Sequence, residues 1–217
     1  MRAFELYTAT DCRHAVALLA EHAASVKILA GGTDLLVELK SAARVPRVVV
    51  DLSRAADLKQ IAVTSRGLAI GALVTHGQIM RSALIRDLCP ALIDAAHTIG
   101  AVQTRNLGTI GGNLATCVPS MDSGPTLVAL DATVTIANAN GERELALAEF
   151  FVGPRKTVLA PGELLKDILI PKANLRKPTH FLKFGLRKGQ ALALVNAAAS
   201  FWADGGKPRA TRIARRA

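Results

Sequence analysis

Cysteine is scarce in this chain of 217 residues, and its three cysteines, Cys12, Cys89 and Cys117, lie far apart. None belongs to a C-x-x-C pair or a Cys/His cluster, so we expect no zinc, iron–sulfur or other metal site. We expect Cys12 and Cys89 to be buried as small apolar side chains. Cys117 closely follows a glycine-rich segment, so it either packs in the core or lies near a ligand.

Long apolar runs and aromatic residues are also missing. Only 4% of the residues are aromatic while 50% are hydrophobic, which is typical of an aliphatic globular protein. Because the sequence has no uncharged apolar run of the length that spans a bilayer, we expect no membrane span. The first residues do not resemble a secretory signal, so we expect a cytoplasmic protein.

Acidic residues are nearly absent from the C-terminal end. Of the formal net charge of +10, +9 falls in residues 176–217, which hold ten Lys or Arg and the single acid Asp204. A basic end can bind a nucleic acid or an acidic partner, but no zinc-finger, RNP or homeodomain signature accompanies it. We therefore expect no nucleic-acid binding, and a nucleic-acid-binding module is only the third hypothesis.

Two glycine turns are the clearest motifs that the sequence does contain. The first is Ala30-Gly31-Gly32-Thr33-Asp34, and the second is Thr109-Ile110-Gly111-Gly112-Asn113. Adjacent glycines permit positive φ and carry no Cβ, so consecutive N–H groups can converge on one anion such as a pyrophosphate. A Gly-Gly pair between apolar runs is also commonly an ordinary turn. Neither turn matches G-x-G-x-x-G or G-x-x-x-x-G-K-[ST], so a Rossmann or P-loop site is not expected.

Together the two turns resemble the paired flavin-binding motifs of the FAD subunit of molybdenum hydroxylases, the xanthine dehydrogenase and carbon monoxide dehydrogenase type. The order of the motifs, their spacing and their flanking residues agree over most of the chain. The resemblance implies an α/β (α+β) fold with a two-lobed FAD-binding domain of the vanillyl-alcohol-oxidase-like type and a shortened C-terminal α/β lobe. The expected lobes are residues 1–53, 54–172 and 173–217.

The resemblance also implies which residues bind the cofactor. Asp122 is expected to accept hydrogen bonds from a sugar hydroxyl of FAD, and a helix N-cap is its alternative role. Leu165, with Ile168 and Leu169 close by, is expected to pack against the isoalloxazine ring or, alternatively, in the core. The residues expected to bind FAD are Lys27, Ile28, Leu29, Ala30, Gly31, Gly32, Thr33, Asp34, Leu35, Thr104, Thr109, Ile110, Gly111, Gly112, Asn113, Asp122, Leu165, Leu169 and Lys183.

Hydrophobic patterning places these motifs on expected elements. Strands are predicted over residues 2–7, 26–29 and 47–52, with helices over about 11–22 and 34–39, so the first turn lies at a helix N-terminus, where anions are favoured. A hairpin turning at residues 138–141 and an edge strand ending at Pro171 are predicted next. Strands are predicted over residues 181–186 and 193–202. His76 and His97 are expected to pack or cap.

Lys183 belongs to a segment similar to the family's aromatic-x-Lys-x-x-x-Arg, here Phe181 to Arg187. Family members commonly carry an Asp shortly afterwards, whereas residues 190–193 have alanine there. In the family the third lobe continues beyond the position that matches Ala217. We therefore expect the third lobe to be incomplete, with apolar side chains of residues 192–202 covered by a partner or a second copy, or locally mobile.

No nucleophile–base pair is visible, so no catalytic side chain is expected; a bound flavin carries the electron chemistry. The resemblance implies the FAD-binding electron-transfer subunit of a heterotrimeric oxidoreductase. Its expected partners are a large subunit with a molybdopterin cofactor and a small subunit with [2Fe-2S] clusters, whose electrons pass to this FAD and on to NAD or another acceptor. The alternative is a free-standing FAD oxidase of the vanillyl-alcohol-oxidase type, although such chains are longer and commonly tether FAD covalently.

Overall fold

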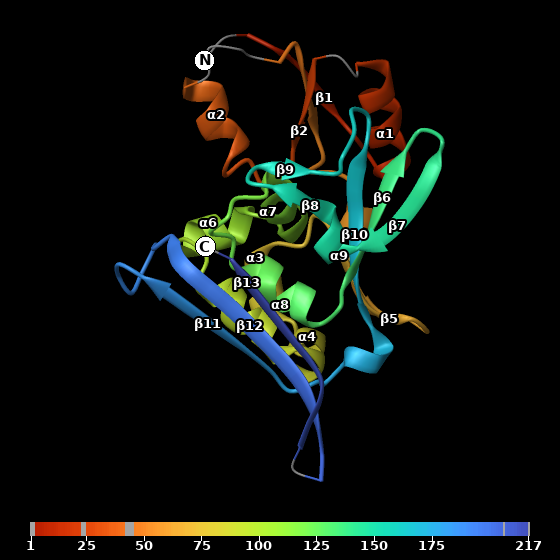
Figure 1. Ribbon diagram of the computed structural model, residues 1–217. Coiled ribbons are helices and arrows are strands. Elements are labelled where there is room, and N and C mark those ends of the chain that lie inside the picture. The colour runs from red at the N-terminus through yellow and green to blue at the C-terminus, as the bar shows by residue number, and fades with distance from the viewer. Residues whose placement is uncertain (1–2, 23–24, 42–45, 206, 217) are drawn as a thin grey trace.

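Three larger β-sheets, of three, five and three strands, follow one another along the chain in the computed structural model, which describes residues 3–22, 25–41, 46–205 and 207–216 (Figure 1). A small fourth sheet pairs β8 (Phe151–Gly153) with β9 (Lys156–Thr157). The first sheet is parallel, with the strand order β1-β3-β2. Its strands are β1 (Glu5–Thr8), β2 (Val26–Leu29) and β3 (Val48–Asp51), and its helices are α1 (Cys12–Glu21) and α2 (Leu35–Ser41). Arg2, where the first strand was expected to begin, lies outside the described residues.

The local sequence explains how this first unit folds. Asp11 caps α1, because its carboxylate accepts a hydrogen bond of 2.8 Å from the His14 N–H. The buried face of α1, including Leu18 and Leu19, packs against Val48 and Val50 of the central strand. Parallel strands need crossover connections, and α1 and α2 provide them. The first glycine turn therefore lies between the end of β2 and the start of α2, as predicted.

The second sheet is antiparallel and has the strand order β4-β5-β10-β6-β7. The hairpin of β6 and β7 turns at residues 138–141, as predicted. The strand that ends at Pro171 was predicted to lie at an edge, which is wrong, because it pairs with β5 on one side and β6 on the other at the centre of the sheet. The part of the chain that contains this sheet, residues 56–174, has the elements η1 (Ala56–Lys59), β4 (Ile61–Val63), β5 (Gly67–Gly71), α3 (His76–Arg81), α4 (Ala83–Leu88), α5 (Pro90–His97), α6 (Val102–Leu107), α7 (Ile110–Thr116), α8 (Ser123–Ala129), β6 (Thr133–Asn138), β7 (Gly141–Ala146), α9 (Leu147–Phe150), β8 (Phe151–Gly153), β9 (Lys156–Thr157), β10 (Leu164–Pro171) and η2 (Lys172–Asn174).

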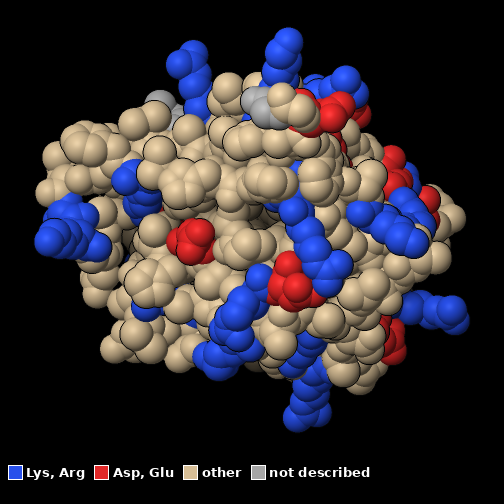
Figure 2. Space-filling view, turned by 90° about the horizontal axis from the view of Figure 1, so that it is seen from below, with Lys and Arg blue, Asp and Glu red and all other residues tan. Residues whose placement is uncertain are grey.

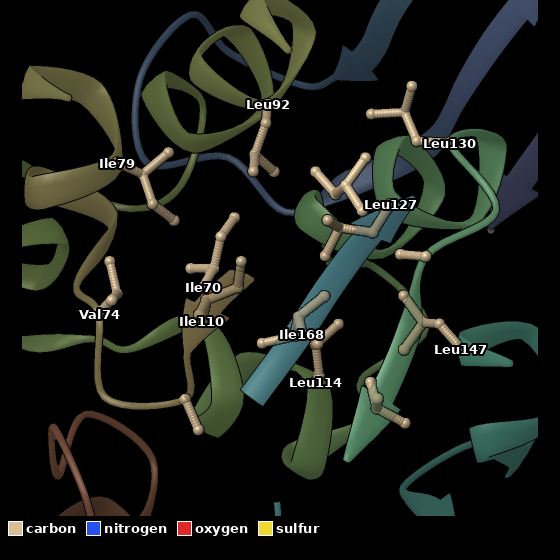
Figure 3. Packing of buried hydrophobic residues seen from close by; sticks show 14 of the residues in the cluster. Ile70, Val74, Ile79, Leu92, Ile110, Leu114, Leu127, Leu130, Leu147 and Ile168 are labelled. Atoms are coloured by element: carbon tan, nitrogen blue, oxygen red, sulfur yellow. The ribbon is translucent and has the colours of Figure 1, made fainter. Parts of the chain in front are cut away.

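The main core lies between this sheet and the helices that connect β5 to β6. Ile70 and Ile168 from the two central strands meet Ile110 and Leu114 of α7 and Leu127 of α8 (Figure 3). All five side chains are fully buried. Burying aliphatic side chains of this size stabilises the fold by about 1.5–3 kcal/mol each, which fixes α7 and the glycine turn that precedes it.

The third sheet is antiparallel, with strands β11 (Thr179–Gly185), β12 (Ala193–Asp204) and β13 (Lys207–Arg216) in that order. One face packs on α5 and α8, where Phe181 and Ala198 are buried and Ser200 Oγ donates a 2.6 Å hydrogen bond to the Ala129 carbonyl. The other face is apolar and exposed. Its large side chains include Leu182, Phe184, Val195 and Ile213.

Strand β13 was not predicted, because its basic residues hide the alternating pattern of a strand. Arg212 reaches Asp131 at 2.9 Å and Arg209 reaches Asp204 at 3.1 Å, so part of the basic end forms exposed ion pairs. Such pairs contribute little to stability. Seen from below, basic side chains are dispersed over the surface with acidic ones between them, rather than gathered into one stripe (Figure 2).

Candidate functional site

The two glycine turns touch each other. A Cβ added to Gly31 would lie 2.0 Å from the Leu107 carbonyl oxygen and 2.9 Å from Gly108 Cα, directly before the second turn. On the other side, the Gly108 carbonyl accepts a hydrogen bond of 3.1 Å from the His76 N–H, and Thr75 pairs with Thr109. The close contact of the two turns therefore depends on the absence of a side chain at Gly31.

Backbone donors remain available at the first turn. The N–H groups of residues 31–34 make no hydrogen bond within the described part of the chain. Gly32 has φ of +72°, a conformation that glycine adopts without strain and that lets successive N–H groups point to one side. The turn also leads into α2, whose N-terminus adds positive potential. The first turn thus has the features of an anion-binding loop.

The second turn differs, because its donors are used inside the protein. Ile110 N–H donates to the Val74 carbonyl and Gly111 N–H to the Ala72 carbonyl, both at 2.9 Å. Thr109 caps α7 by accepting from Gly112 N–H at 3.1 Å. A Cβ on Gly111 would lie 2.5 Å from Ala72 Cβ. The idea that both turns offer free N–H groups is therefore wrong for the second, where Gly111 permits close packing on Ala72 and Gly112 lines both chambers.

A two-part cavity lies beside these turns. The first chamber, of about 290 Å³, and the second chamber, of about 540 Å³, share Ile28, Ala30, Leu35, Gly112 and Thr116. Two adjoining chambers, the first lined by the anion-binding loop of residues 31–34, suit a dinucleotide. The predicted residues that line it are Lys27, Ile28, Ala30, Gly31, Gly32, Thr33, Asp34, Leu35, Thr104, Thr109, Gly111, Gly112, Asn113, Asp122, Leu165 and Lys183.

Three predicted residues do not line the cavity. Leu29 packs beside Gly32, with its Cδ1 3.1 Å from where a Gly32 Cβ would sit. Ile110 is fully buried in the main core. Leu169 lies four residues beyond Leu165 on β10, opposite Thr133 and Ala69, too far along the strand to reach either chamber.

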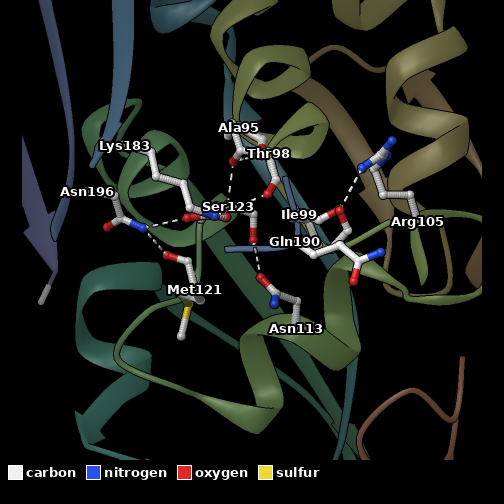
Figure 4. A network of polar contacts seen from close by, with 12 residues as sticks. Ala95, Thr98, Ile99, Arg105, Asn113, Met121, Ser123, Lys183, Gln190 and Asn196 are labelled. Atoms are coloured by element: carbon white, nitrogen blue, oxygen red, sulfur yellow. Dashed lines mark hydrogen bonds and ion pairs between the residues drawn. The ribbon is translucent and has the colours of Figure 1, made fainter. Parts of the chain in front are cut away.

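A buried polar network closes one end of the first chamber (Figure 4). Asp122, only 4% exposed, accepts hydrogen bonds from Lys183 Nζ at 2.5 Å, Thr98 Oγ1 at 3.1 Å and Asn196 Nδ2 at 2.8 Å. Asp122 precedes α8 but makes no capping bond, so its alternative role as a capping side chain is wrong. The network instead fastens β11 and β12 to the cavity wall.

Several lining residues escaped sequence reasoning. Ile99 and Gly100 form a loop that Arg105 fixes by donating to both carbonyls, at 2.9 and 3.1 Å (Figure 4). Ser120 and Met121 lie on the loop before α8, and His76 begins α3. None of these residues forms a motif in the linear sequence. For Ser120 and Met121 the sequence offers one signal, which is that residues 118–122 closely follow the second turn.

The cysteines do not line either chamber. Cys117 is fully buried and donates to the carbonyls of Gly153 and Lys156, so it packs against β8 and β9 rather than facing a ligand. Cys12 and Cys89 are buried as expected, and burial raises the pKa of the Cys89 thiol to about 12. Within the described ranges no group of His, Cys, Asp or Glu is arranged to hold a metal ion, and no helix is long and apolar enough to cross a membrane.

His76 is the one histidine that lines the cavity within the described part of the chain. Its side chain is almost fully enclosed, and the residue is only 2% exposed. Burial, with a smaller effect from the Arg105 charge, lowers the pKa of His76 to about 4. The imidazole is therefore neutral at physiological pH.

We expect this buried histidine to make the fold sensitive to acid. In the unfolded chain His76 binds a proton near pH 6.5, whereas in the folded chain it does so only near pH 4. The unfolded state therefore binds more protons between these values, and stability falls as the pH drops through that window, by up to about 3 kcal/mol. Urea denaturation of wild type and His76→Leu across the window measures this loss. His76→Leu should lack this loss of stability, whereas His97→Leu, at an exposed position, should retain it. Equal acid sensitivity in all three proteins would contradict the attribution of the loss to His76.

Comparison with known proteins gives one consistent result. The family model described as the FAD binding domain in molybdopterin dehydrogenase matches residues 2–173. The nicotinate dehydrogenase FAD-subunit of Eubacterium barkeri is 34% identical over 199 residues, 90% of this chain and 67% of that protein. The carbon monoxide dehydrogenase medium chain of Hydrogenophaga pseudoflava is 32% identical over 168 residues, 77% of this chain and 58% of that protein.

Solved structures agree. A carbon monoxide dehydrogenase of Hydrogenophaga pseudoflava that lacks the Mo-pyranopterin moiety of its cofactor matches with a TM-score of 0.94 at 28% identity, over 99% of this chain and 75% of that chain. Quinoline 2-oxidoreductase of Pseudomonas putida 86 matches with a TM-score of 0.92 at 30% identity, over 99% and 74%. The chain thus spans about half to three-quarters of the relatives it matches.

Proposed function

The chain belongs to the family of FAD binding domains in molybdopterin dehydrogenases, and from this premise we propose that it is the FAD-binding electron-transfer part of a molybdenum-containing oxidoreductase. Its mixed α/β fold is that of the flavoprotein chains of carbon monoxide dehydrogenases. The observation that carries the proposal is the first glycine turn, whose free N–H groups face the two-part cavity.

The residues present fit FAD. The N–H groups of residues 31–34 would hold the pyrophosphate, since an anion at a helix N-terminus with unpaired donors is favoured. The hydroxyls of Thr33 and Thr104 and the carboxylate of Asp122 line the first chamber, where sugar hydroxyls can be bound. Leu35 and Leu165 give the second chamber an apolar wall for one of the ring systems. We propose that Leu165 packs against the isoalloxazine ring.

The bound flavin supplies the electron transfer, and the chain's own residues bind and orient it. Contact between Gly31 and Leu107 holds the two turns at a fixed separation, and the network around Asp122 shields one end of the first chamber from solvent. A catalytic side chain is not required for this task.

We further propose partner subunits, because relatives are named an FAD-subunit, a medium chain or a medium subunit, and such names imply further subunits. A large subunit with a molybdenum cofactor would oxidise the substrate, a small subunit with [2Fe-2S] clusters would deliver the electrons to this chain, and NAD or another acceptor would receive them in the cytoplasm. The three subunits would form a heterotrimer. Co-purification of the tagged chain with one large and one small iron–sulfur subunit tests this assembly.

The test of the function is flavin binding. Purified chain, stripped of cofactor and titrated with FAD, should bind one equivalent and quench flavin fluorescence. The flavin should be released by acid precipitation, whereas a free-standing oxidase with a covalent tether would retain it. Absence of saturable FAD binding by a folded chain would overturn the proposal.

A further inference from the structure

His76 lies where the two glycine turns meet, with no hydrogen-bond partner for its ring in the described part of the chain. We propose that His76 is a ligand of the FAD pyrophosphate, and that its neutral ring donates one hydrogen bond from Nε2 to a phosphate oxygen. This inference rests on the proposed function and assigns a specific part of the cofactor to a residue outside both glycine motifs.

The backbone of His76 is held firmly against the second turn. Its N–H donates to the Gly108 carbonyl at 3.1 Å, and Thr75 forms a capping box with Gln78 at the start of α3. Gly77 lies so close to α6 that an added Cβ would be 2.5 Å from Asn106 Oδ1. Because helix and turn are fixed together, the imidazole is positioned before any ligand arrives.

Burial leaves only one ring nitrogen of His76 open to a ligand. Nδ1 is sealed from solvent and has no hydrogen-bond partner. Nε2, the nitrogen next to Cδ2, is therefore the one that can contact a ligand. We assign the proton of the neutral ring to Nε2, since only that tautomer donates toward the first chamber.

The position of Cδ2 places this donor beside the first turn. A single point, where a Gly108 Cβ would sit, lies 3.6 Å from His76 Cδ2 and 3.5 Å from Thr33 Oγ1. Cδ2 therefore lies no farther than these two distances added together from Thr33 Oγ1, in the turn whose N–H groups are free. A phosphate held by those groups comes within reach of Nε2.

Charge in the first chamber favours such a neutral donor. Lys183 is paired with Asp122, and Arg105 donates to two carbonyls. Asp34 adds a negative charge to the lining, where Asp122 is balanced by Lys183. Lys183 is the one Lys or Arg among the described residues that line the first chamber, and it is already paired. The pyrophosphate there would depend on N–H donors, and hydrogen bonds to an anion are the stronger kind.

The test separates a donor from a space-filling ring. His76→Leu removes the donor and His76→Gln keeps an amide N–H. Titration at neutral pH should show FAD affinity about 10- to 100-fold weaker in His76→Leu, the range for one charge-assisted hydrogen bond, and largely restored in His76→Gln. His97→Leu should bind as wild type. Thermal unfolding without FAD confirms that each variant is folded.

Two spectroscopic readouts are independent of affinity. In protein labelled with ¹⁵N-histidine, the Nε2 signal of His76 should move when FAD binds, and the ³¹P signals of bound FAD should differ between wild type and His76→Gln. A purely structural histidine would leave both unchanged. If folded His76→Leu bound FAD with the same affinity as wild type, this inference alone would be overturned. Absence of FAD binding by wild type would overturn the proposed function and this inference with it.

Discussion

Replacing Gly31 by alanine is expected to weaken FAD binding at least about 100-fold, because the new Cβ would lie 2.0 Å from the Leu107 carbonyl oxygen. The obstructing atoms are backbone, which cannot move aside as a flexible side chain can. The first turn must therefore shift away from the second, and the four free N–H groups of residues 31–34 lose their place beside the cavity.

A comparison of neighbouring glycines makes this prediction sharper. Gly32→Ala should be milder, since its Cβ would meet only the ends of Leu29 and Leu36 at 3.1 Å, and its cost is mainly the left-handed φ, about 1–2 kcal/mol. Gly153→Ala, where nothing lies within 4 Å of the added Cβ, is the control and should bind as wild type. FAD titration with circular dichroism measures binding and folding together. Full flavin occupancy in Gly31→Ala would contradict the contact between the turns.

The sequence alone located the two turns but not the difference between them. Both read as Gly-Gly after an apolar run, and the local pattern indicates where the backbone can bend. Whether an N–H group is free depends on acceptors elsewhere in the chain. For the second turn these acceptors are the carbonyls of Ala72 and Val74, which the fold brings there from before α3. No local signal predicts that placement.

The fold shows the same limit. The hairpin of β6 and β7 was predicted with its turn at residues 138–141, whereas β13 was not predicted, because arginine occupies positions on both its faces. Likewise, Lys183 and Asp122 were each expected to contact FAD, but nothing in the sequence pairs them. Only the packing of β11 on α5 and α8 brings the two charges together.

Asp122→Ala is expected to destabilise the protein by about 3–5 kcal/mol, because it leaves the ammonium group of Lys183 buried without a counter-charge. The Lys183 side chain is only 10% exposed and its Nζ would keep just the Thr98 carbonyl, at 3.1 Å. Asn196 would lose one acceptor as well. The loss of stability should fall mainly on the third sheet, so amide hydrogen exchange in β11 and β12 should accelerate more than in β6. FAD affinity should also drop, because Asp122 and Lys183 line the first chamber.

Matched variants separate the buried charge from other effects. Asp87→Ala breaks an ion pair with Arg176 in which both side chains are more than half exposed, and it should cost less than about 1 kcal/mol. The double variant Asp122→Leu with Lys183→Met removes both buried charges, so it should recover much of the stability lost in Asp122→Ala. Urea denaturation of wild type, this double variant and its two single variants, Asp122→Leu and Lys183→Met, gives the coupling energy between Asp122 and Lys183. If Asp122→Ala cost no more than Asp87→Ala, the network would not be what fastens the third sheet to the cavity wall.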